Sequence, residues 1–296
     1  IRLSLVGSEM CIRDRWLAQQ AEELEVEIYP GFSASEVLYD ENNKVVGIAT
    51  CDMGRLKDGS EGPNFERGIE LRAKQTVFSE GCRGHLGKTL MEKFELNSNN
   101  SPQTYGIGIK ELWEVAPENS KPGSIMHTTG WPLDNETYGG SFLYHLDDNK
   151  ISIGFVIGLD YKNPYLSPYL EFQRFKHHPA IKKLLEGGRR INYGARALNE
   201  GGVQSLPKLT FPGGMLVGCE AGFLNVPKIK GTHLAMKSGM IAAQSIFENI
   251  DKHDEISDFQ TDIKQSWLWN ELYKVRNIRP SFKWGFWKAI AYSAID

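Results

Sequence analysis

A glycine-rich turn links an apolar run to a helical pattern between Gly213 and Ala243, where the chain reads GGMLVGCEAGFLNVPKIKGTHLAMKSGMIAA. Glycine adopts positive φ angles and has no Cβ, so such a turn lets backbone N–H groups approach a bulky ligand closely. We expect the helix to start near Thr232, a candidate cap, and its free N–H groups and dipole favour negative charge. The pattern predicts a site for an anionic or electron-rich group, with an ordinary strand-to-helix corner as the alternative.

A second turn follows the β-like run Gln75–Phe78 and has the sequence Glu80-Gly81-Cys82-Arg83-Gly84. A strand, an acidic residue, a glycine and an arginine before a helix resemble the second cofactor-contacting motif of the large FAD-binding oxidase and hydroxylase fold. There, this turn and the later glycine turn hold opposite parts of one flavin nucleotide. For Arg83 taken alone, the alternative is a surface or structural arginine. The candidate FAD-binding residues are Glu80, Gly81, Arg83, Gly218, Gly222, Gly231 and Thr232.

Five long segments narrow the resemblance to one family. They are YGIGIKELWEV (105–115), GWPLDNETYGGSFLYHL (130–146), GFVIGLDYKNPYLSP (154–168), GFLNVPKIKGTH (222–233) and ELYKVRNIRPSF (271–282). From about Trp16 to its last residue, the chain resembles the electron-transfer flavoprotein:ubiquinone oxidoreductases (ETF-QO). It departs from the broader flavoprotein fold in having Cys219 and Glu220 after Gly218, where an aspartate is usual, and this leaves the ribityl contact of that aspartate open.

The resemblance implies a flavoprotein that passes electrons from reduced electron-transfer flavoprotein to ubiquinone, in the pathway of fatty-acid β-oxidation. It implies attachment to the matrix face of the mitochondrial inner membrane, or to the cytoplasmic face of a bacterial inner membrane. No catalytic side chain and no metal ligand is assigned within this chain.

A ubiquinone site needs an apolar slot and close backbone approach, and the stretch 138–142 fits both requirements. The candidate quinone-binding residues are Tyr138, Gly139, Gly140 and Phe142. A β-turn with core aromatics is the alternative. His127 and His145 are candidates for proton transfer to the reduced quinone, against the alternative of structural histidines.

ETF-QO proteins also have an N-terminal GxGxxG unit and a C-terminal domain with a [4Fe–4S] cluster, and neither is expected here. The GxG triplet Gly106-Ile107-Gly108 lacks the third glycine and the following helix. The four cysteines, Cys11, Cys51, Cys82 and Cys219, form no CxxC pair, whereas the cluster needs four thiolates in clustered spacing. We therefore expect an internal fragment that binds FAD poorly, is inactive alone, and lacks the domain that electron-transfer flavoprotein would reduce.

Composition is that of a soluble-looking α/β protein: 296 residues, 41% hydrophobic, 24% charged, with a net charge of −3. This near-neutral balance provides no basic stripe for phosphates and argues against nucleic-acid binding. The scattered cysteines suggest a reducing compartment. Residues 1–15 (IRLSLVGSEMCIRDR) do not fit the family and resemble a translated sequencing adapter. Their apolar stretch is shorter than the ~7–15 residues of a signal-peptide core.

Periodicity and turn signals predict the elements that position these residues. Helices are expected at 16–24, 84–94, 167–177 and 179–186, with Ser167 as an N-cap, and strands at 27–30, 35–39, 44–51, 69–78, 103–111 and 150–159, with a loop at 53–68. The fold class is α/β with an α+β insertion: a partial FAD-binding domain of the glutathione-reductase/hydroxylase type and an inserted, sheet-containing ubiquinone-binding domain. The predicted division is 1–15 adapter-like, 16–95 FAD domain with a β-hairpin insertion, 96–200 ubiquinone-binding domain, 201–250 return to the FAD domain, and 251–296 linker and membrane segment.

The C-terminal segment mixes aromatic and cationic residues. Its candidate membrane contacts are Phe282, Trp284, Phe286 and Trp287, with Arg279, Lys283 and Lys288 as cations that extend toward lipid headgroups. The apolar run is too interrupted to span a bilayer, which needs ~20 residues. Attachment at the membrane interface is predicted, and a helix covered by another domain is the alternative.

Two other functions remain open from the sequence. One is a geranylgeranyl-reductase-like or hydroxylase-like FAD enzyme that uses a nicotinamide reductant. The other is a non-catalytic, membrane-associated fragment that retains no cofactor.

Overall fold

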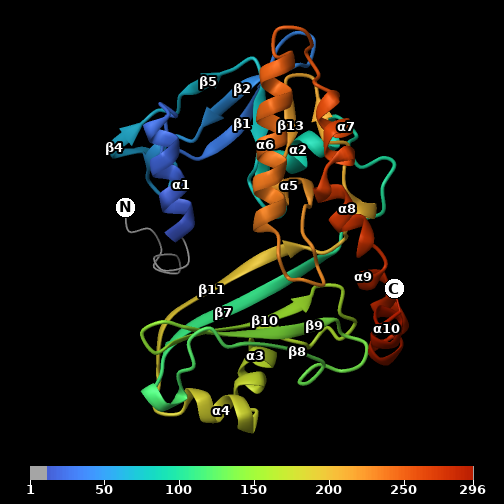
Figure 1. The fold of residues 1–296 in the computed structure, drawn as a ribbon. Coiled ribbons are helices and arrows are strands. Elements are labelled where there is room, and N and C mark those ends of the chain that lie inside the picture. The colour runs from blue at the N-terminus through green and yellow to red at the C-terminus, as the bar shows by residue number, and fades with distance from the viewer. Residues whose placement is uncertain (1–11, 296) are drawn as a thin grey trace. The chain divides into compact units, whose positions relative to one another are not determined.

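The computed structural model describes residues 12–295, so that most of the adapter-like segment lies outside the described residues and residues 12–15 begin helix α1 (Ile12–Glu23). The helix predicted over 16–24 is confirmed. The chain divides into two compact units (Figure 1). Unit 1 contains the residues up to Pro30, Thr104–Leu198 and Ser281–Ile295, and unit 2 contains Gly31–Gln103 and Asn199–Pro280.

A small, partly parallel sheet forms the centre of unit 2. Strand β6 (Thr76–Phe78) pairs in parallel with β13 (Gly214–Leu216), which pairs with β12 (Thr210–Phe211) in the antiparallel direction. Phe78, Phe211, Met215 and Leu216 of these strands are buried in one core with side chains of α2 (His85–Lys93) and α6 (Thr232–Asn249). The short helix α5 (Gly218–Ala221) follows β13. Because β6 and β13 run in parallel, the two predicted cofactor turns leave the sheet at the same edge.

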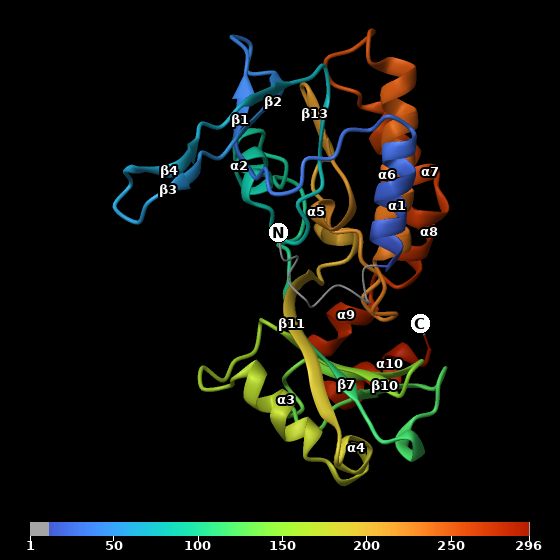
Figure 2. The same ribbon diagram turned by 90° about the vertical axis from the view of Figure 1, so that its left-hand side faces the viewer.

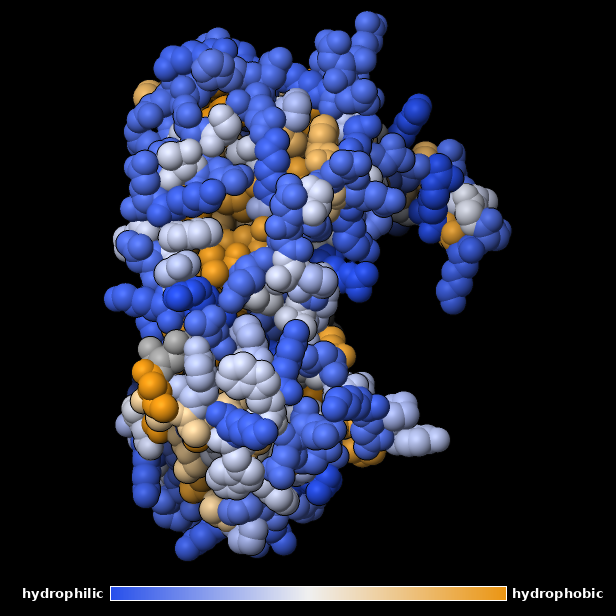
Figure 3. Space-filling model, turned by 90° about the vertical axis from the view of Figure 1, so that its right-hand side faces the viewer, coloured by the Kyte–Doolittle hydropathy of each residue, from blue (hydrophilic) through white to orange (hydrophobic). Residues whose placement is uncertain are grey.

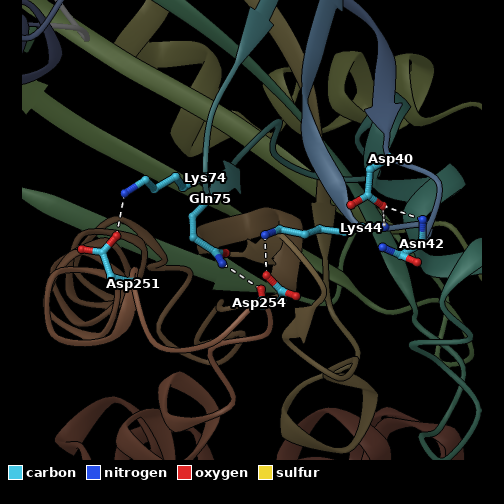
Figure 4. A network of polar contacts seen from close by, with 7 residues as sticks. All are labelled: Asp40, Asn42, Lys44, Lys74, Gln75, Asp251 and Asp254. Carbon is cyan, nitrogen blue, oxygen red and sulfur yellow. Dashed lines mark hydrogen bonds and ion pairs between the residues drawn. The ribbon is translucent and has the colours of Figure 1, made fainter.

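The β-hairpin insertion of unit 2 is formed by β1 (Ala34–Tyr39) and β2 (Val45–Thr50), as predicted, with β5 (Glu70–Arg72) on the other side of β2. Polar contacts connect it to the chain after α6 (Figure 4). Lys44 forms an ion pair with Asp254, Lys74 contacts Asp251 at 2.5 Å, and the Gln75 amide donates to the carbonyl of Asp254 at 2.8 Å. These exposed ion pairs contribute little individually, on the order of 0–1 kcal/mol.

Two predictions for the first 70 residues are wrong. Residues 27–30 do not form a strand, since none of the strands in the described residues pairs with this segment. Residues 53–68 are not a loop but contain the two-stranded sheet of β3 (Met53–Arg55) and β4 (Glu61–Glu66). Neither strand of that hairpin is apolar, so the hydrophobic pattern did not reveal it.

The segment 251–280, which the sequence suggested as a linker, contributes to the core of unit 2. Helices α7 (Asp258–Gln265) and α8 (Trp267–Lys274) bury Phe259, Ile263 and Leu268 completely. The short helix α9 (Ile278–Ser281) follows, and its Arg279 is 6% exposed and pairs with buried Glu200 at 3.3 Å. The prediction that Arg279 extends toward lipid headgroups is therefore wrong, because its charge is used inside unit 2.

Unit 1 is an antiparallel sheet covered on one face by two helices. The strand order is β11 (Arg189–Asn199), β7 (Tyr105–Glu114), β10 (Lys150–Gly158), β9 (Gly139–Leu146) and β8 (Ile125–Thr129). Helices α3 (Pro168–Lys176) and α4 (Pro179–Leu185) lie on one face of this sheet, as Figures 1 and 2 show. Ser167 caps α3 by accepting from the N–H of Leu170, as predicted. The triplet Gly106-Ile107-Gly108 lies within β7, not in a nucleotide-binding turn.

Three short 3-10 helices complete the described elements: η2 (Pro117–Asn119), η3 (Val203–Ser205) and η4 (Phe282–Trp284). The last of these leads through Gly285 into α10 (Phe286–Ser293), at the C-terminal end of unit 1. Within residues 12–295, none of the helices combines the length and apolar character that crossing a bilayer requires.

Candidate functional site

The two predicted cofactor turns lie side by side in unit 2. The N–H of Val217 donates to the carbonyl of Phe78 at 3.1 Å, which continues the β6–β13 pairing to the point where both turns begin. Asn199 then connects the turns themselves. Its side-chain oxygen accepts from the Cys82 thiol at 2.8 Å, and its amide donates to the Cys219 carbonyl at 2.6 Å. Residues 80–84 and 218–222 therefore lie together at the carboxyl edge of the parallel strands, the edge at which open α/β sheets bind ligands.

Glu80 holds the first turn onto the helix that follows. Its two carboxylate oxygens accept from the backbone N–H groups of Leu86 at 3.2 Å and Gly87 at 2.8 Å. These N–H groups belong to the first turn of α2 and have no partner within the helix. The turn is tightly wound, since Gly81 and Arg83 both have positive φ angles, of 93° and 59°. The Arg83 side chain is exposed.

Glu220 occupies the interior of the same corner. It is 3% exposed, and neither of its carboxylate oxygens has a hydrogen-bond partner among the residues that the structure describes. A Cβ placed on Gly84 would lie 2.1 Å from one of these oxygens, and a Cβ on Gly87 would lie 1.8 Å from the other. Burial, and second the charge of Glu80, raises the pKa of Glu220 from 4.5 to about 7. Glu220, one of the two residues that follow Gly218 where an aspartate is usual, is thus packed against the start of α2.

The second turn is shaped by two left-handed glycines and anchored to α6. Gly218 and Gly222 have φ angles of 60° and 98°, which other residues adopt at a cost. The N–H of Gly218 donates to the fully buried Ser238 hydroxyl at 2.9 Å. The prediction that Thr232 caps α6 is wrong, because Gly231 is the N-cap and the exposed Thr232 is the first helical residue. Gly231 and Thr232 nevertheless mark the end of α6 that carries free N–H groups.

The predicted quinone residues lie in unit 1, around strand β9. Tyr138 precedes β9 and packs edge-on against Phe282, with 4.7 Å between ring centroids. Phe142 stacks on Tyr144 at 5.0 Å and lies directly over Gly154, where a Cβ would be 2.2 Å from the Phe142 ring. These two rings lie on the sheet face opposite to the one covered by α3 and α4, since residues alternate along a strand.

Gly139 and Gly140 are closely packed by their neighbours. A Cβ on Gly139 would lie 2.4 Å from the Leu133 side chain and 2.5 Å from the carbonyl oxygen of Val156, and one on Gly140 would lie 2.5 Å from the carbonyl oxygen of Thr128. Glycine is therefore required at both positions by the packing of the sheet.

The two candidate histidines differ in their surroundings. His127 pairs with Phe142 across β8 and β9, and its Nε2 lies 3.2 Å from the Tyr144 hydroxyl, on the aromatic face of the sheet. His145 is 7% exposed on the opposite face, and its Nδ1 accepts from the backbone N–H of Lys121 at 3.2 Å. Burial, and second the charge of Lys121, lowers the pKa of His145, which favours a neutral, structural ring.

The C-terminal aromatics divide into packed and exposed residues. Phe282 contacts Tyr138, and Phe286 packs over Gly130 while its N–H donates to the carbonyl of Asn135 at 3.0 Å. Trp284 and Trp287 are 59% and 71% exposed, and Ile290 and Ile295 next to them are exposed as well. Figure 3 shows the side of the molecule that carries the C-terminus, with hydrophobic residues set among hydrophilic ones.

Sequence reasoning missed the residues that join the motifs. Asn199, Ser238 and Glu271 lie outside the glycine turns. They contact Cys219, Gly218 and Asn225, respectively, only in the folded chain. A cavity of about 460 Å³ is lined by residues after α2, around η3 and on α7, and none of the predicted site residues lines it. The glycines and helix-start residues, from which the turns were predicted, contain no information on the partners Asn199, Ser238 and Glu271.

Known proteins are similar to this chain over most of its length. A domain family described as "ETF-QO, ubiquinone-binding" matches residues 105–198. This range contains the whole five-stranded sheet except Asn199, the last residue of β11. The mitochondrial electron transfer flavoprotein-ubiquinone oxidoreductase of Sus scrofa is 59% identical over 276 residues, which is 90% of this chain and 45% of that protein. The chain thus spans about half the length of the curated relatives it matches.

Solved structures of similar fold are more distant in sequence. A geranylgeranyl bacteriochlorophyll reductase-like protein from Thermoplasma acidophilum has a TM-score of 0.70 at 19% identity, covering 92% of this chain and 62% of its own. The flavin-dependent brominase Bmp2 has a TM-score of 0.55 at 18% identity, covering 91% of this chain and 59% of its own. These likenesses confirm the predicted fold class, a partial FAD-binding domain with a sheet-containing insertion. The chain thus contains a region that matches the "ETF-QO, ubiquinone-binding" family, and over 90% of its length it is similar to electron transfer flavoprotein-ubiquinone oxidoreductases.

Proposed function

We propose that this chain is the FAD-binding and ubiquinone-binding part of an enzyme that transfers electrons from reduced electron-transfer flavoprotein to ubiquinone. The observation that carries the proposal is the meeting of the two glycine turns at one edge of the β6–β13 pair, in a chain 59% identical to named members of this family. The remaining parts, with the iron–sulfur ligands, are supplied by flanking sequence, and this chain alone is inactive.

FAD is held in this proposal by the site in unit 2. The left-handed glycines Gly218 and Gly222 bring backbone N–H groups close to the cofactor, and the start of α6 at Gly231 and Thr232 faces its electron-rich part. Gly81 and exposed Arg83 contact its nucleotide end, with the turn fixed by Glu80. FAD, when bound, accepts electrons singly and passes them on as a pair.

Ubiquinone is held in this proposal by the aromatic face of unit 1. Tyr138 and Phe142 provide flat apolar walls, and Gly139 and Gly140 form the backbone between them. Between the two candidate histidines, His127 is the better proton carrier because it lies beside Tyr144 on this face. His145 keeps a structural role in the proposal.

The exposed Trp284 and Trp287 attach the protein to a membrane surface, where indole rings favour the interface. Their neighbours Phe282 and Phe286 are packed against unit 1 and fix the orientation of this segment. The inner mitochondrial membrane is the proposed location, in line with the mitochondrial names of the relatives, with a bacterial inner membrane as the alternative.

The decisive experiment compares the 296-residue chain with a version extended by its flanking coding sequence. We expect flavin absorbance near one FAD per chain, and reduction of a ubiquinone analogue by reduced electron-transfer flavoprotein, only in the extended protein. Arg83→Ala in that protein should lower its FAD content, while the exposed, Glu70-paired Arg72→Ala should not. An extended protein without flavin, or with flavin but without quinone reduction, would contradict the proposal.

A geranylgeranyl-reductase-like activity is the second candidate, because the Thermoplasma acidophilum structure of that name has a TM-score of 0.70. Such an enzyme would oxidise a nicotinamide cofactor and reduce an isoprenoid double bond. Rapid nicotinamide oxidation by the extended protein, in the absence of electron-transfer flavoprotein, would favour this candidate over the first.

A further inference from the structure

The loop between α5 and α6 is held by contacts from both of its ends. Asn225 and Lys230 form an isolated antiparallel bridge, with backbone hydrogen bonds of 2.9 and 3.2 Å in the two directions. Between them, Ile229 has a φ angle of 55°, a left-handed conformation that is unfavourable for a β-branched residue. Such a residue persists only where surrounding contacts determine the backbone strongly.

Those contacts converge on one carboxylate from a distant helix. Glu271 lies on α8, and its Oε1 accepts from the Asn225 amide at 2.8 Å and lies 2.9 Å from Nε2 of His233 and 3.3 Å from Nζ of Lys228. The three partners come from the start of the loop, its middle and the first turn of α6. One side chain thus contacts the whole length of the loop.

The surroundings of Glu271 suit an ionised group. Its side chain is 20% exposed, and burial alone would disfavour the charge. Hydrogen bonds from His233, Asn225 and Lys228, together with the charge of His233, outweigh burial and lower the pKa of Glu271. The His233 ring also stacks almost parallel to Trp267, the first residue of α8, with 5.9 Å between ring centroids.

The loop is the segment that sets where α6 begins. Asn225 is completely buried, and its side-chain oxygen accepts from the N–H of Lys228 at 3.2 Å, so the loop cannot shift without breaking buried contacts. Gly231 and Thr232 follow directly and open α6. A group that fixes the loop therefore fixes the free N–H groups at the start of this helix.

We infer that Glu271 is a positioning residue for the cofactor site: it orders the 225–233 loop through Asn225, Lys228 and His233 and so places the N-terminus of α6 for FAD. The inference rests on the proposed function for the identity of the ligand. The ordering of the loop itself does not depend on FAD.

The test uses Glu271→Gln and Glu271→Ala, with Glu248→Gln as the control, since Glu248 is exposed on α6. The first readout is hydrogen exchange of loop amides in the 296-residue chain without cofactor. We expect the amides of 225–233 to exchange about ten-fold faster in Glu271→Ala than in the wild type, with a smaller increase in Glu271→Gln. The exchange rates should not change in the control variant, nor at β6 and β13 in any variant. Unchanged exchange in both variants would overturn the inference.

The second readout is the dissociation constant for FAD in the extended protein, with the visible circular dichroism of the bound flavin. We expect Glu271→Gln to weaken binding several-fold and to alter the flavin spectrum, with thermal stability close to that of the control. Faster loop exchange with unaltered FAD affinity would overturn the positioning role. If the wild-type extended protein binds no FAD, the proposed function fails and the cofactor role with it, while the exchange data still decide whether Glu271 orders the loop.

Discussion

The glycines of the two units are required for different physical reasons. In unit 2, Gly218 adopts a φ angle of 60°, and a Cβ there would meet Ala235 only at ordinary contact distance, 3.4 Å. In unit 1, Gly139 lies at the start of a regular strand, but a Cβ would be 2.5 Å from a backbone oxygen of β10. The first glycine is selected by backbone conformation and the second by close packing. A glycine near a ligand site is therefore not by itself evidence of ligand contact.

The largest effect is expected for Gly139→Ala. Because the new methyl group meets the Val156 carbonyl oxygen, which cannot move without disturbing the strand pairing, we expect the free energy of unfolding to fall by about 3 kcal/mol. Chemical denaturation measures this. The matched control is Gly239→Ala, within α6, where nothing lies within 4 Å of the added Cβ and stability should rise by up to about 1 kcal/mol.

This result also decides how the quinone site can be probed. If Gly139→Ala lowers stability as expected, loss of quinone reduction in that variant would not identify a quinone contact. Phe142→Leu in the extended protein is then the better probe, since it removes a half-buried ring from the sheet face opposite α3 and α4. A Gly139→Ala variant as stable as wild type would remove the contrast between the two units.

The buried carboxyl of unit 2 should make stability depend on pH. The pKa of Glu220 is raised to about 7 in the folded chain, against an ordinary value of 4.5, so the folded state binds the proton more tightly than the unfolded state. Its contribution is therefore fully present below pH 4.5 and is lost as the pH rises through 7. Glu220→Gln should match wild type near pH 4.5 and exceed it by about 2 kcal/mol at pH 8.

Thermal melts of both proteins between pH 4.5 and 8.5 measure this difference, with the exposed Glu248→Gln as the control. Parallel pH profiles for Glu220→Gln and wild type would mean that Glu220 is ionised or solvated in the folded chain. They would also remove a second difference between the units, namely that Glu220 is a buried carboxyl without a hydrogen-bond partner beside the glycine turns of unit 2.

A smaller effect is expected for Gly218→Ala. The cost is mainly that of a left-handed alanine, about 1 kcal/mol, because the space beside Gly218 nearly accommodates a methyl group. Denaturation of the 296-residue chain measures it. A loss as large as that in Gly139→Ala would show that packing rather than conformation requires glycine here as well.

The smallest effect on stability is expected for Trp287→Ser in unit 1. Trp287 is 71% exposed, so its removal should change the free energy of unfolding by less than about 0.5 kcal/mol. Binding to phospholipid vesicles should nevertheless weaken several-fold, measured by co-sedimentation. The control is Tyr165→Ser, which removes another exposed aromatic of unit 1, one that is 92% exposed and lies outside the C-terminal segment. Equal vesicle binding by both variants and wild type would contradict the membrane role.

Sequence patterns predicted most elements of this chain because these elements are encoded locally. The hairpin of β1 and β2, the helices α2, α3 and α4, and the Ser167 cap follow from apolar periodicity, turn residues and a capping side chain. Two of the predictions that proved wrong concern strands. The β3–β4 hairpin is polar, and the 27–30 segment has strand-like residues but no pairing strand among those described.

The amino-acid sequence by itself predicted the two glycine turns, their order in the chain and the resemblance to ETF-QO proteins, because glycine conformation and idiosyncratic motifs are properties of short segments. Only the tertiary structure decided that Asn199 links the turns, that Glu220 is buried beside α2, and that Glu271 holds the loop before α6. Each of these contacts joins residues far apart in the chain. A side chain's burial and partners depend on which elements pack around it, and no local pattern carries that information.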